Sequence, residues 1–474
     1  MTINQLKKLI TERFQYQPTD GQSILISIIA EFLLDQEARN LLVIKGYAGT
    51  GKTSIVKAIV KVLEEYEHGT VLLAPTGRSA KVLANYSECP AYTIHKKIYK
   101  LDSDAEGNVK INLLPNLHIN TLFVVDEASM ISVSSNIQTN TFSQRSLLND
   151  LIEYIYNGHN CRLILIGDTA QLPPVGTNIS PALDINFLQA SYNLKLRSFE
   201  LTEVVRQEAH SGILYNATLI RKLLVSEKKN YNLKFNLKKF NDIISLNGEE
   251  LEDELNSAYS NYGAEETIVI CRSNKRANLF NQQIRAKIFS RESDITGGDL
   301  LMVVKNNYFW LPENSKVPFI ANGEIMKVQR IKGMQELYGF HFAEARVSFP
   351  DYPDENSIDV LLLSDTLNSE SPSLSVLENK KLYETILEEY QDIHGKRKQI
   401  QKVKENKYYN ALQIKFALAL TCHKSQGGQW KAVFIEQGYL KDNILDKDYL
   451  RWLYTALTRA TEKVYLVNFN EKFL

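Results

Sequence analysis

The chain has 474 residues, of which 44% are hydrophobic and 23% charged, and its 55 Lys and Arg residues balance its 55 Asp and Glu residues. This length predicts two or more domains, because a single hydrophobic core stops growing well below it. No apolar run reaches the roughly 20 residues of a membrane span, and with a formal net charge of zero any nucleic-acid binding must come from a local channel.

The N-terminal segment and the cysteines indicate the setting in which the chain works. Residues 1–20 carry charges but no apolar signal core, and the four cysteines have neither disulfide nor metal spacing. The cysteines are Cys89, Cys161, Cys271 and Cys422. We therefore expect a reducing, cytoplasmic setting and no membrane partner.

Short apolar runs rich in Val, Ile and Leu recur along the first half, with helical segments between them. They cover residues 41–46, 70–75, 121–129 and 161–168. Unbroken runs of this length are typical of strands that are buried on both faces of a parallel sheet. A second group of such runs covers residues 267–273, 432–436 and 463–469. The sequence therefore predicts an α/β fold with two related parallel sheets.

The first run leads into "GYAGTGKTS", residues 46–54, which matches the pattern G-x-x-x-x-G-K-[ST] between a strand and a helix. Its glycines let backbone N–H groups approach phosphates, and the helix N-terminus adds positive potential. Lys52 would reach the β- and γ-phosphates, and the Thr53 hydroxyl would bind Mg²⁺. We therefore predict ATP and Mg²⁺ as cofactors. The expected nucleotide-binding residues of this segment are Gly46, Ala48, Gly49, Thr50, Gly51, Lys52, Thr53 and Ser54.

Two segments interrupt the α/β pattern. Residues 97–114 offer two strand-like arms around the turn residues "DAEGN", which predicts a β-hairpin. From residue 320 to 410 the sequence first alternates like antiparallel strands and then becomes helical and highly charged. We interpret residues 320–410 as an inserted subdomain.

Hydrolysis of a bound nucleotide needs carboxylates as well as a phosphate loop. In "LFVVDEASM", Asp126 ends an apolar run and is the natural metal ligand. Glu127 beside it is the candidate base that orients or deprotonates the attacking water. "LILIGDTAQLPPVG" ends a further run with Asp168, and Gln171 there could hydrogen-bond a γ-phosphate. Because both segments follow expected strands, we expect both at the nucleotide site.

Taken in order, these segments resemble the motifs of superfamily I helicases, and most closely those of the RecD-like branch. The matching segments besides the phosphate loop are "PTDGQSILI", "APTGRSAKVL" (74–83), "YTIHKKI" (92–98), "VVDEASM", "GDTAQLPPVG", "LTEVVRQ" (201–207), "TIVICRSNKRANLFNQQIR", "ALTCHKSQGGQW" (419–430) and "WLYTALTRATEKVYLV" (452–467). They span nearly the whole chain, and the ordered series is far more specific than any one motif.

The resemblance implies two RecA-like motor domains with ATP in the cleft between them. The first domain would cover residues 1–217, and the second would cover residues 218–319 and 411–474. Residues 320–410 would hold an SH3-like barrel with a helical extension, and the hairpin would be the pin that splits a duplex. A decorative surface ribbon is the alternative interpretation of the hairpin, because its tip is acidic.

The resemblance also assigns roles to single residues. Gln22 would read the adenine, and Gln429 stands where many relatives have an acidic residue that can bind the ribose. Arg206 and Arg459 would contact the γ-phosphate, with Arg459 supplied by the second motor domain. Single-stranded DNA would contact Thr76, Arg78, Thr93, His95, Pro174, Thr421, His423, Lys424 and Ser425.

The leading hypothesis is an ATP-dependent DNA helicase that moves 5′ to 3′, with the polarity resting on the resemblance alone. We expect a monomer that binds single-stranded DNA and its junctions with duplex DNA. An RNA helicase of the same superfamily is the second hypothesis, because phosphate and stacking contacts do not decide the sugar. The third is an ATP-switched clamp, although a switch would not need the full hydrolytic set of residues. No extra carboxylate cluster supports a nuclease, and replication, repair and recombination all stay open.

Overall fold

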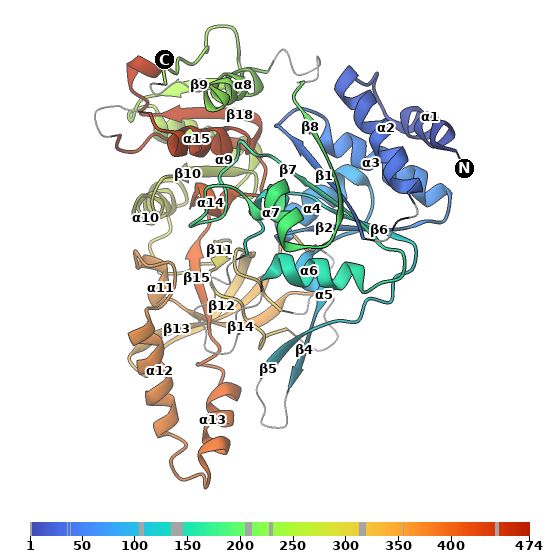
Figure 1. Ribbon diagram of the computed structural model, residues 1–474. Coiled ribbons are helices and arrows are strands. Elements are labelled where there is room, and N and C mark those ends of the chain that lie inside the picture. The colour runs from blue at the N-terminus through green and yellow to red at the C-terminus, as the bar shows by residue number, and fades with distance from the viewer. Residues whose placement is uncertain are drawn as a thin grey trace.

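The computed structural model describes residues 2–35, 37, 39–103, 109–133, 146–203, 211–226, 231–311, 319–353, 355–440 and 445–474. These residues form two parallel sheets with helices around them, a closed β-barrel and a two-stranded hairpin (Figure 1). Within the described ranges, no helix combines the length and the apolar character that crossing a bilayer requires.

The first sheet has six parallel strands. In spatial order they are β3 (Ala91–Thr93), β2 (Gly69–Ala74), β6 (Thr121–Val125), β7 (Arg162–Gly167), β1 (Asn40–Gly46) and β8 (Lys195–Leu201). The helical elements of this part are α1 (Ile3–Arg13), α2 (Asp20–Leu34), α3 (Lys52–Glu65), α4 (Gly77–Ser87), α5 (Ile94–Ile98), η1 (Ala128–Met130), α6 (Leu147–Tyr156), η2 (Pro181–Leu183) and α7 (Ile185–Ser191).

Strand β1 shows why apolar runs predicted this sheet. Leu42 and Ile44 pack into the core beneath α1, α2 and α3, whereas Leu41 and Val43 pack into the core beneath α5, α6 and α7. Successive side chains of a strand point to opposite faces, so a strand covered by helices on both faces needs an unbroken apolar run. The predicted α/β fold is confirmed. Strand β8 was not predicted, because at the edge of the sheet it is only partly buried and mixes polar with apolar residues.

The second sheet has five parallel strands. In spatial order they are β16 (Ala419–Thr421), β10 (Thr267–Cys271), β17 (Trp430–Glu436), β18 (Ala460–Val467) and β9 (Ile243–Leu246). The helical elements of this part are α8 (Gly212–Val225), α9 (Leu251–Tyr262), α10 (Asn274–Gln283), the π-helix η4 (Ile284–Ile288), α14 (Cys422–Ser425), α15 (Lys447–Leu457) and η6 (Glu471–Phe473).

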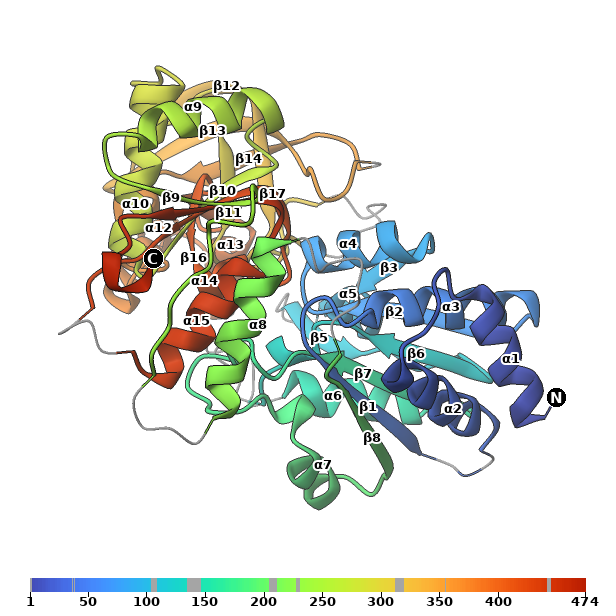
Figure 2. The same ribbon diagram turned by 90° about the horizontal axis from the view of Figure 1, so that it is seen from above.

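Helices α8 and α15 lie between the two sheets when the molecule is seen from above (Figure 2). Ile213 and Ala217 of α8 already pack into the core of the second sheet. The whole of α8 therefore packs in the core of the second sheet. The expected domain boundary between residues 217 and 218 falls within this helix, and the structure places it before the helix begins at Gly212. A helical pattern shows which residues are apolar but not which of two neighbouring cores they enter.

The barrel closes through five strands in chain order. They are β11 (Leu300–Val303), β12 (Ile325–Leu337), β13 (Phe340–Ser348), β14 (Ile358–Leu363) and β15 (Leu412–Phe416). The expected range of 320–410 misses β11 and β15, which pair antiparallel with Leu301 opposite Phe416. Strand β11 is a short apolar run that looks like part of a parallel sheet, and β15 alternates apolar residues with Gln413 and Lys415. Only closure of the barrel brings these two strands together. The expected helical extension consists of α11 (Asp365–Asn368), α12 (Val376–Glu388) and α13 (Lys396–Glu405).

The expected hairpin is present as β4 (Tyr99–Ser103) and β5 (Val109–Leu113), paired antiparallel with Tyr99 opposite Leu113. Its tip, residues 104–108, lies outside the described residues. In Figure 1 the hairpin projects below the first sheet, in the same direction in which α12 and α13 project from the barrel. The two accessory parts therefore lie on one side of the molecule.

The barrel packs directly on the start of α4. Lys81 of α4 donates a hydrogen bond to the Pro350 carbonyl at 2.6 Å. A Cβ atom at Gly77 would lie 2.5 Å from the Tyr352 hydroxyl and 2.8 Å from Glu324 Oε1, so a larger residue there would displace these side chains of the barrel. Because α4 follows β2, the barrel is fixed beside the carboxyl edge of the first sheet.

Glu324 at this contact should make stability depend on pH. It is 6% exposed, and burial raises the pKa of its carboxyl to about 7. The folded state therefore holds the proton more tightly than the unfolded state, so this group's stabilising contribution is complete below the unfolded pKa and is lost as pH rises through about 7. Glu324→Gln imitates the protonated form and should raise the free energy of unfolding at pH 8 by roughly 1 to 3 kcal/mol.

Thermal unfolding at pH 8 and pH 5 measures this effect. The difference between Glu324→Gln and the wild type should shrink at pH 5, where both side chains are neutral. Glu344→Gln changes an exposed carboxyl on β13 and should give the same small shift at both pH values. A lower Tm of Glu324→Gln at pH 8 would show that the buried carboxylate is well stabilised after all.

Candidate active site

The carboxyl ends of three neighbouring parallel strands meet at one edge of the first sheet. The phosphate-loop pattern follows β1, Asp126 follows β6, and Asp168 follows β7. Ligands of open parallel sheets bind at this edge, because the loops and helix N-termini gather there. The fold therefore brings the predicted nucleotide-binding and carboxylate segments together.

The phosphate loop is held by its own side chains. Gly49 and Gly51 have φ values of 74° and 82°, which favour glycine. The Lys52 ammonium donates to the carbonyls of Gly46 and Tyr47 at 2.7 and 2.8 Å, so it lies folded against the loop. An anion in the loop would compete with these two carbonyls for the same ammonium.

Gln22 lies against the phosphate loop and is 1% exposed. Its amide nitrogen donates to the Thr50 carbonyl at 3.0 Å, and its amide oxygen accepts from the Thr19 N–H at 2.9 Å as part of the cap of α2. The structure thus places Gln22 as a brace between α2 and the loop. The Gln22 amide has a second N–H hydrogen and a second oxygen lone pair, with which it could contact an adenine.

The two adjacent acidic residues, Asp126 and Glu127, are joined by a hydrogen bond. Asp126 accepts a hydrogen bond from the Glu127 N–H at 2.9 Å, and burial, followed by the Glu127 charge, raises the pKa of Asp126 to about 6. Glu127 has φ 51° and ψ 36°, a left-handed conformation that a non-glycine residue adopts only when its surroundings impose it. Asp126 and Thr53 offer a carboxylate and a hydroxyl, the hard oxygen donors that suit Mg²⁺.

The loop after β7 supplies Asp168 and Gln171. Asp168 is 2% exposed, its Oδ1 accepts from the Ala170 N–H at 2.8 Å, and burial raises its pKa. Gln171 is also buried, and its Oε1 finds no donor among the described residues. A buried acceptor without a donor is costly, so this oxygen fits a water or ligand group at the site.

Arg459 reaches the site from the second sheet. It is 3% exposed, and its guanidinium lies 3.7 Å from Glu127 Oε1. It also donates to the Gly428 carbonyl at 3.2 Å and to the Thr455 carbonyl at 3.1 Å. The structure therefore brings this arginine to the predicted catalytic carboxylate across the gap between the two sheets. Arg206, the other expected arginine, lies outside the described residues.

The expected DNA-contact residues of both halves meet beside α4. Thr76 and Thr93 are the N-caps of α4 and α5, whose preceding strands β2 and β3 are neighbours. A Cβ atom at Gly427 would lie 3.0 Å from the Thr76 hydroxyl, so the 421–430 segment rests directly on α4. Two motifs that are about 350 residues apart in the sequence thus share one surface.

Arg78 and Gln429 hold this contact together. The Arg78 guanidinium donates to the Gln429 carbonyl at 2.8 Å and lies over the Trp430 ring at 4.2 Å from its centroid. The Gln429 side chain accepts from the Tyr86 hydroxyl at 3.5 Å. Arg78 therefore bridges the two halves of the chain. Gln429 lies against α4, and none of its described hydrogen bonds reaches the phosphate loop.

The remaining expected contacts differ in exposure. Burial lowers the pKa of His95 to about 4, and its ring packs against Tyr99 and Phe319. Ser425 is fully buried and donates to the Cys422 carbonyl at 2.9 Å. His423 is exposed, and Lys424 and Pro174 are half-buried. His423 is thus the most accessible of the expected contacts in its motif.

Residues that the motifs did not single out complete the site. Tyr454 of α15 donates to Asp168 Oδ2 at 2.6 Å and accepts from the Ala48 N–H at 2.9 Å. Thr455 accepts from the Leu172 N–H at 2.9 Å. In the sequence these two residues belong to the buried face of an amphipathic helix, which gives no sign of a polar role.

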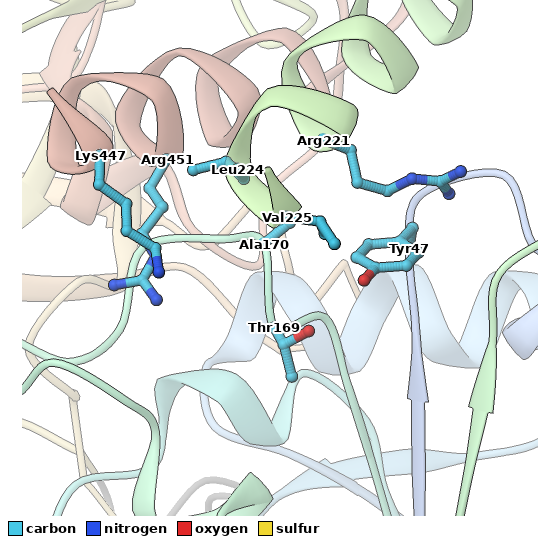
Figure 3. Close-up of a pocket in the computed structure, with 8 residues that line it drawn as sticks. All are labelled: Tyr47, Thr169, Ala170, Arg221, Leu224, Val225, Lys447 and Arg451. Atoms are coloured by element: carbon cyan, nitrogen blue, oxygen red, sulfur yellow. The ribbon is translucent and has the colours of Figure 1, made fainter. Parts of the chain in front are cut away.

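A pocket opens where the phosphate loop, the loop after β7, α8 and α15 meet (Figure 3). Its lining residues are Tyr47, Thr169, Ala170, Arg221, Leu224, Val225, Lys447 and Arg451. Arg221 lies over the Tyr47 ring at 4.3 Å from its centroid. Three basic side chains of α8 and α15, Arg221, Lys447 and Arg451, therefore line a pocket beside the first glycine of the phosphate loop.

No cluster of three or more His, Cys, Asp or Glu side chains that could hold a metal occurs in the described part of the chain. A magnesium ion at Thr53 and Asp126 would need only these two protein ligands, because Mg²⁺ takes the rest of its oxygens from phosphate and water.

Comparisons with known proteins agree with this arrangement. Residues 27–228 match the AAA domain, and residues 416–467 match the UvrD-like helicase C-terminal domain. The uncharacterized protein R530 of Acanthamoeba polyphaga mimivirus is 22% identical over 94% of this chain and 98% of its own length.

Two relatives carry functional names. The ATP-dependent DNA helicase dda of Enterobacteria phage T4 is 28% identical over 60% of this chain and 60% of its own length. The ATP-dependent RecD2 DNA helicase of Deinococcus radiodurans is 32% identical over 39% of this chain and 22% of its own length. The matches thus span less than two thirds of either helicase. A solved Bacteroides Pif1 helicase with ADP-AlF3 and ssDNA gives a TM-score of 0.46 and 16% identity over 96% of this chain and 94% of that chain.

The geometry predicts separate roles for binding and hydrolysis. Glu127→Gln keeps the shape of the side chain but removes the predicted base, so ATP turnover should fall by about 100-fold or more. Nucleotide binding should persist, because Lys52 and the loop amides are untouched. A phosphate-release assay and a fluorescent-nucleotide titration measure the two effects. Glu153→Gln, at an exposed position of α6, is the matched control. Turnover that survives in Glu127→Gln would place the base elsewhere.

Proposed function

We propose that this chain, which belongs to the superfamily I helicases of the RecD-like type, uses ATP hydrolysis to move 5′ to 3′ along single-stranded DNA and to separate duplexes. The observation that carries the proposal is the approach of Arg459 to Glu127, at 3.7 Å, between a phosphate-loop sheet and a second sheet. An arginine supplied across a cleft completes the charge-stabilising shell only when the two domains are together.

In this proposal the first motor holds the nucleotide and the second completes the site. Lys52 and the loop amides would bind the phosphates, and Glu127 would orient and deprotonate the attacking water. Thr53 and Asp126 would hold a magnesium ion, which neutralises phosphate charge when bound. Gln171 would place its free amide oxygen near the γ-phosphate and its water. Closure of the cleft is then tied to ATP, and opening is tied to hydrolysis.

The shared surface beside α4 supports a nucleic-acid path across both motors. Hydroxyls of Thr76, Thr93 and Thr421, together with the exposed His423, can contact phosphates and bases without reading sequence. Because Arg78 links α4 to the 421–430 segment, a change in the spacing of the motors also changes this surface. The relatives named as DNA helicases support DNA as the substrate, and single-stranded DNA and its junctions as the partners.

Duplexes with single-stranded tails test in one experiment the direction of movement and the choice between DNA and RNA. Unwinding of a duplex with a 5′ tail, and little unwinding with a 3′ tail, is the expected result. Matched RNA duplexes should be poor substrates. Lys52→Ala serves as the control without turnover, because it removes the phosphate-binding ammonium. Preference for the 3′ tail would overturn the polarity, preference for RNA would overturn the substrate, and turnover without unwinding would favour a clamp.

Trimming the hairpin separates movement from strand separation. Replacing residues 101–111 by a two-residue turn keeps the paired base of β4 and β5, where Tyr99 faces Leu113. DNA-stimulated ATP turnover should stay within about twofold of wild type, because the nucleotide site is untouched, while unwinding should fall by about tenfold or more. Normal unwinding by the trimmed protein would make the hairpin a decorative ribbon.

A further inference from the structure

Helix α15 places one tyrosine hydroxyl between two loops of the first motor. Tyr454 is 1% exposed and belongs to the second motor. Its hydroxyl donates to Asp168 Oδ2 at 2.6 Å and accepts from the Ala48 N–H at 2.9 Å. Ala48 lies in the phosphate loop, and Asp168 begins the loop that carries Gln171. A single oxygen atom of the second motor therefore joins both nucleotide-facing loops of the first.

The protonation of the Tyr454 phenol decides which atom donates in each of these hydrogen bonds. Burial holds the pKa of Tyr454 well above its usual value, so the phenol stays protonated and its O–H donates the hydrogen bond to Asp168 Oδ2. The remaining lone pair accepts the Ala48 N–H. Asp168 has one further described donor, the Ala170 N–H, on its other oxygen. Separation of the motors would therefore leave Asp168 Oδ2 and the Ala48 N–H without their described partner at the same moment.

The same turn of α15 makes a further contact with the Gln171 loop. Thr455 accepts from the Leu172 N–H at 2.9 Å, which fixes the residue after Gln171. The Thr455 carbonyl in turn accepts from Arg459 Nε at 3.1 Å. The helix that positions Arg459 is thus the helix that holds the phosphate loop and the Gln171 loop.

We infer that Tyr454 is a positioning residue that latches the second motor onto the phosphate loop and the Gln171 loop, so that Arg459 is aligned for hydrolysis when the cleft closes. The inference rests on the proposed ATP turnover at this cleft. The two hydrogen bonds form and break together, so the latch favours a closed and an open state over intermediate spacings. The latch acts through Asp168, Ala48 and Arg459, and it leaves Lys52 free to bind phosphate.

Tyr454→Phe removes only the hydroxyl and keeps the packed ring. Loss of a hydrogen bond to a buried carboxylate should lower kcat for DNA-stimulated ATP turnover by about 10- to 100-fold. The KM for ATP should change by less than about threefold, because the groups that bind ground-state phosphate are unchanged. Asp168→Asn combined with Tyr454→Phe should lose little more than the larger single variant, because both remove one interaction.

Tyr449→Phe is the matched control on the same helix. Tyr449 is also buried, but its hydroxyl makes no hydrogen bond with either loop in the described part of the chain. This variant should keep kcat within about twofold of wild type. A kcat of Tyr454→Phe within that range would overturn the latch. So would an equal loss in both variants, which would indicate general packing, and so would additive losses with Asp168→Asn.

A second measurement does not depend on turnover. Cysteines at exposed Tyr66 of the first motor and exposed Tyr439 of the second, in a Cys89→Ser background, carry dyes for energy transfer. With ADP and aluminium fluoride, Tyr454→Phe should populate the short-distance state less than wild type does. Equal closure would overturn the latch. If the wild type hydrolyses no more ATP than Lys52→Ala, the proposed function fails, and the closure measurement still decides the role of Tyr454.

Discussion

Two acidic side chains of the first motor, the buried Asp168 and the half-buried Glu127, have partners that the second motor supplies. Asp168 takes a proton donor from Tyr454, and Glu127 lies beside the Arg459 guanidinium. A buried carboxylate that loses its partner is strongly destabilised, so the face of the first motor is incomplete on its own. The second sheet must therefore lie where Tyr454 and Arg459 can reach the acidic residues at the carboxyl edge of the first sheet. It also explains why the nucleotide site and the domain interface are one place.

The segment that contacts Arg459 also connects the carboxyl edge of the first sheet to the surface beside α4. The segment between β16 and β17 packs on α4 through Gly427 and is held there by Arg78, and its Gly428 carbonyl also accepts from Arg459. A movement of Arg459 would therefore shift Gly428 and, with it, the residues that face the proposed DNA path. Such a segment can transmit closure because it makes discrete contacts at both of its ends.

The accessory parts are placed by the first motor as well. The barrel contacts Gly77 and Lys81 of α4. The first strand of the hairpin, β4, begins at the residue that follows α5. Both parts point to one side of the molecule in Figure 1. A strand that leaves the surface beside α4 would thus meet the hairpin and the barrel together. Their common attachment supports the proposal that a duplex is separated at the hairpin, beside this surface.

The sequence by itself determined the elements whose information is local. The phosphate loop needs glycines, a lysine and a threonine at fixed spacing, and buried parallel strands need unbroken apolar runs, so both were predicted from contiguous residues. Only the tertiary structure decided which distant groups meet: the closure of the barrel by β11 and β15, the bridge from Arg78 to Trp430, and the hydroxyl of Tyr454 between Asp168 and Ala48. A tyrosine on the apolar face of a helix looks like any core aromatic. Its polar role exists only because two separately folded sheets pack so that one oxygen atom lies within hydrogen-bond distance of both loops.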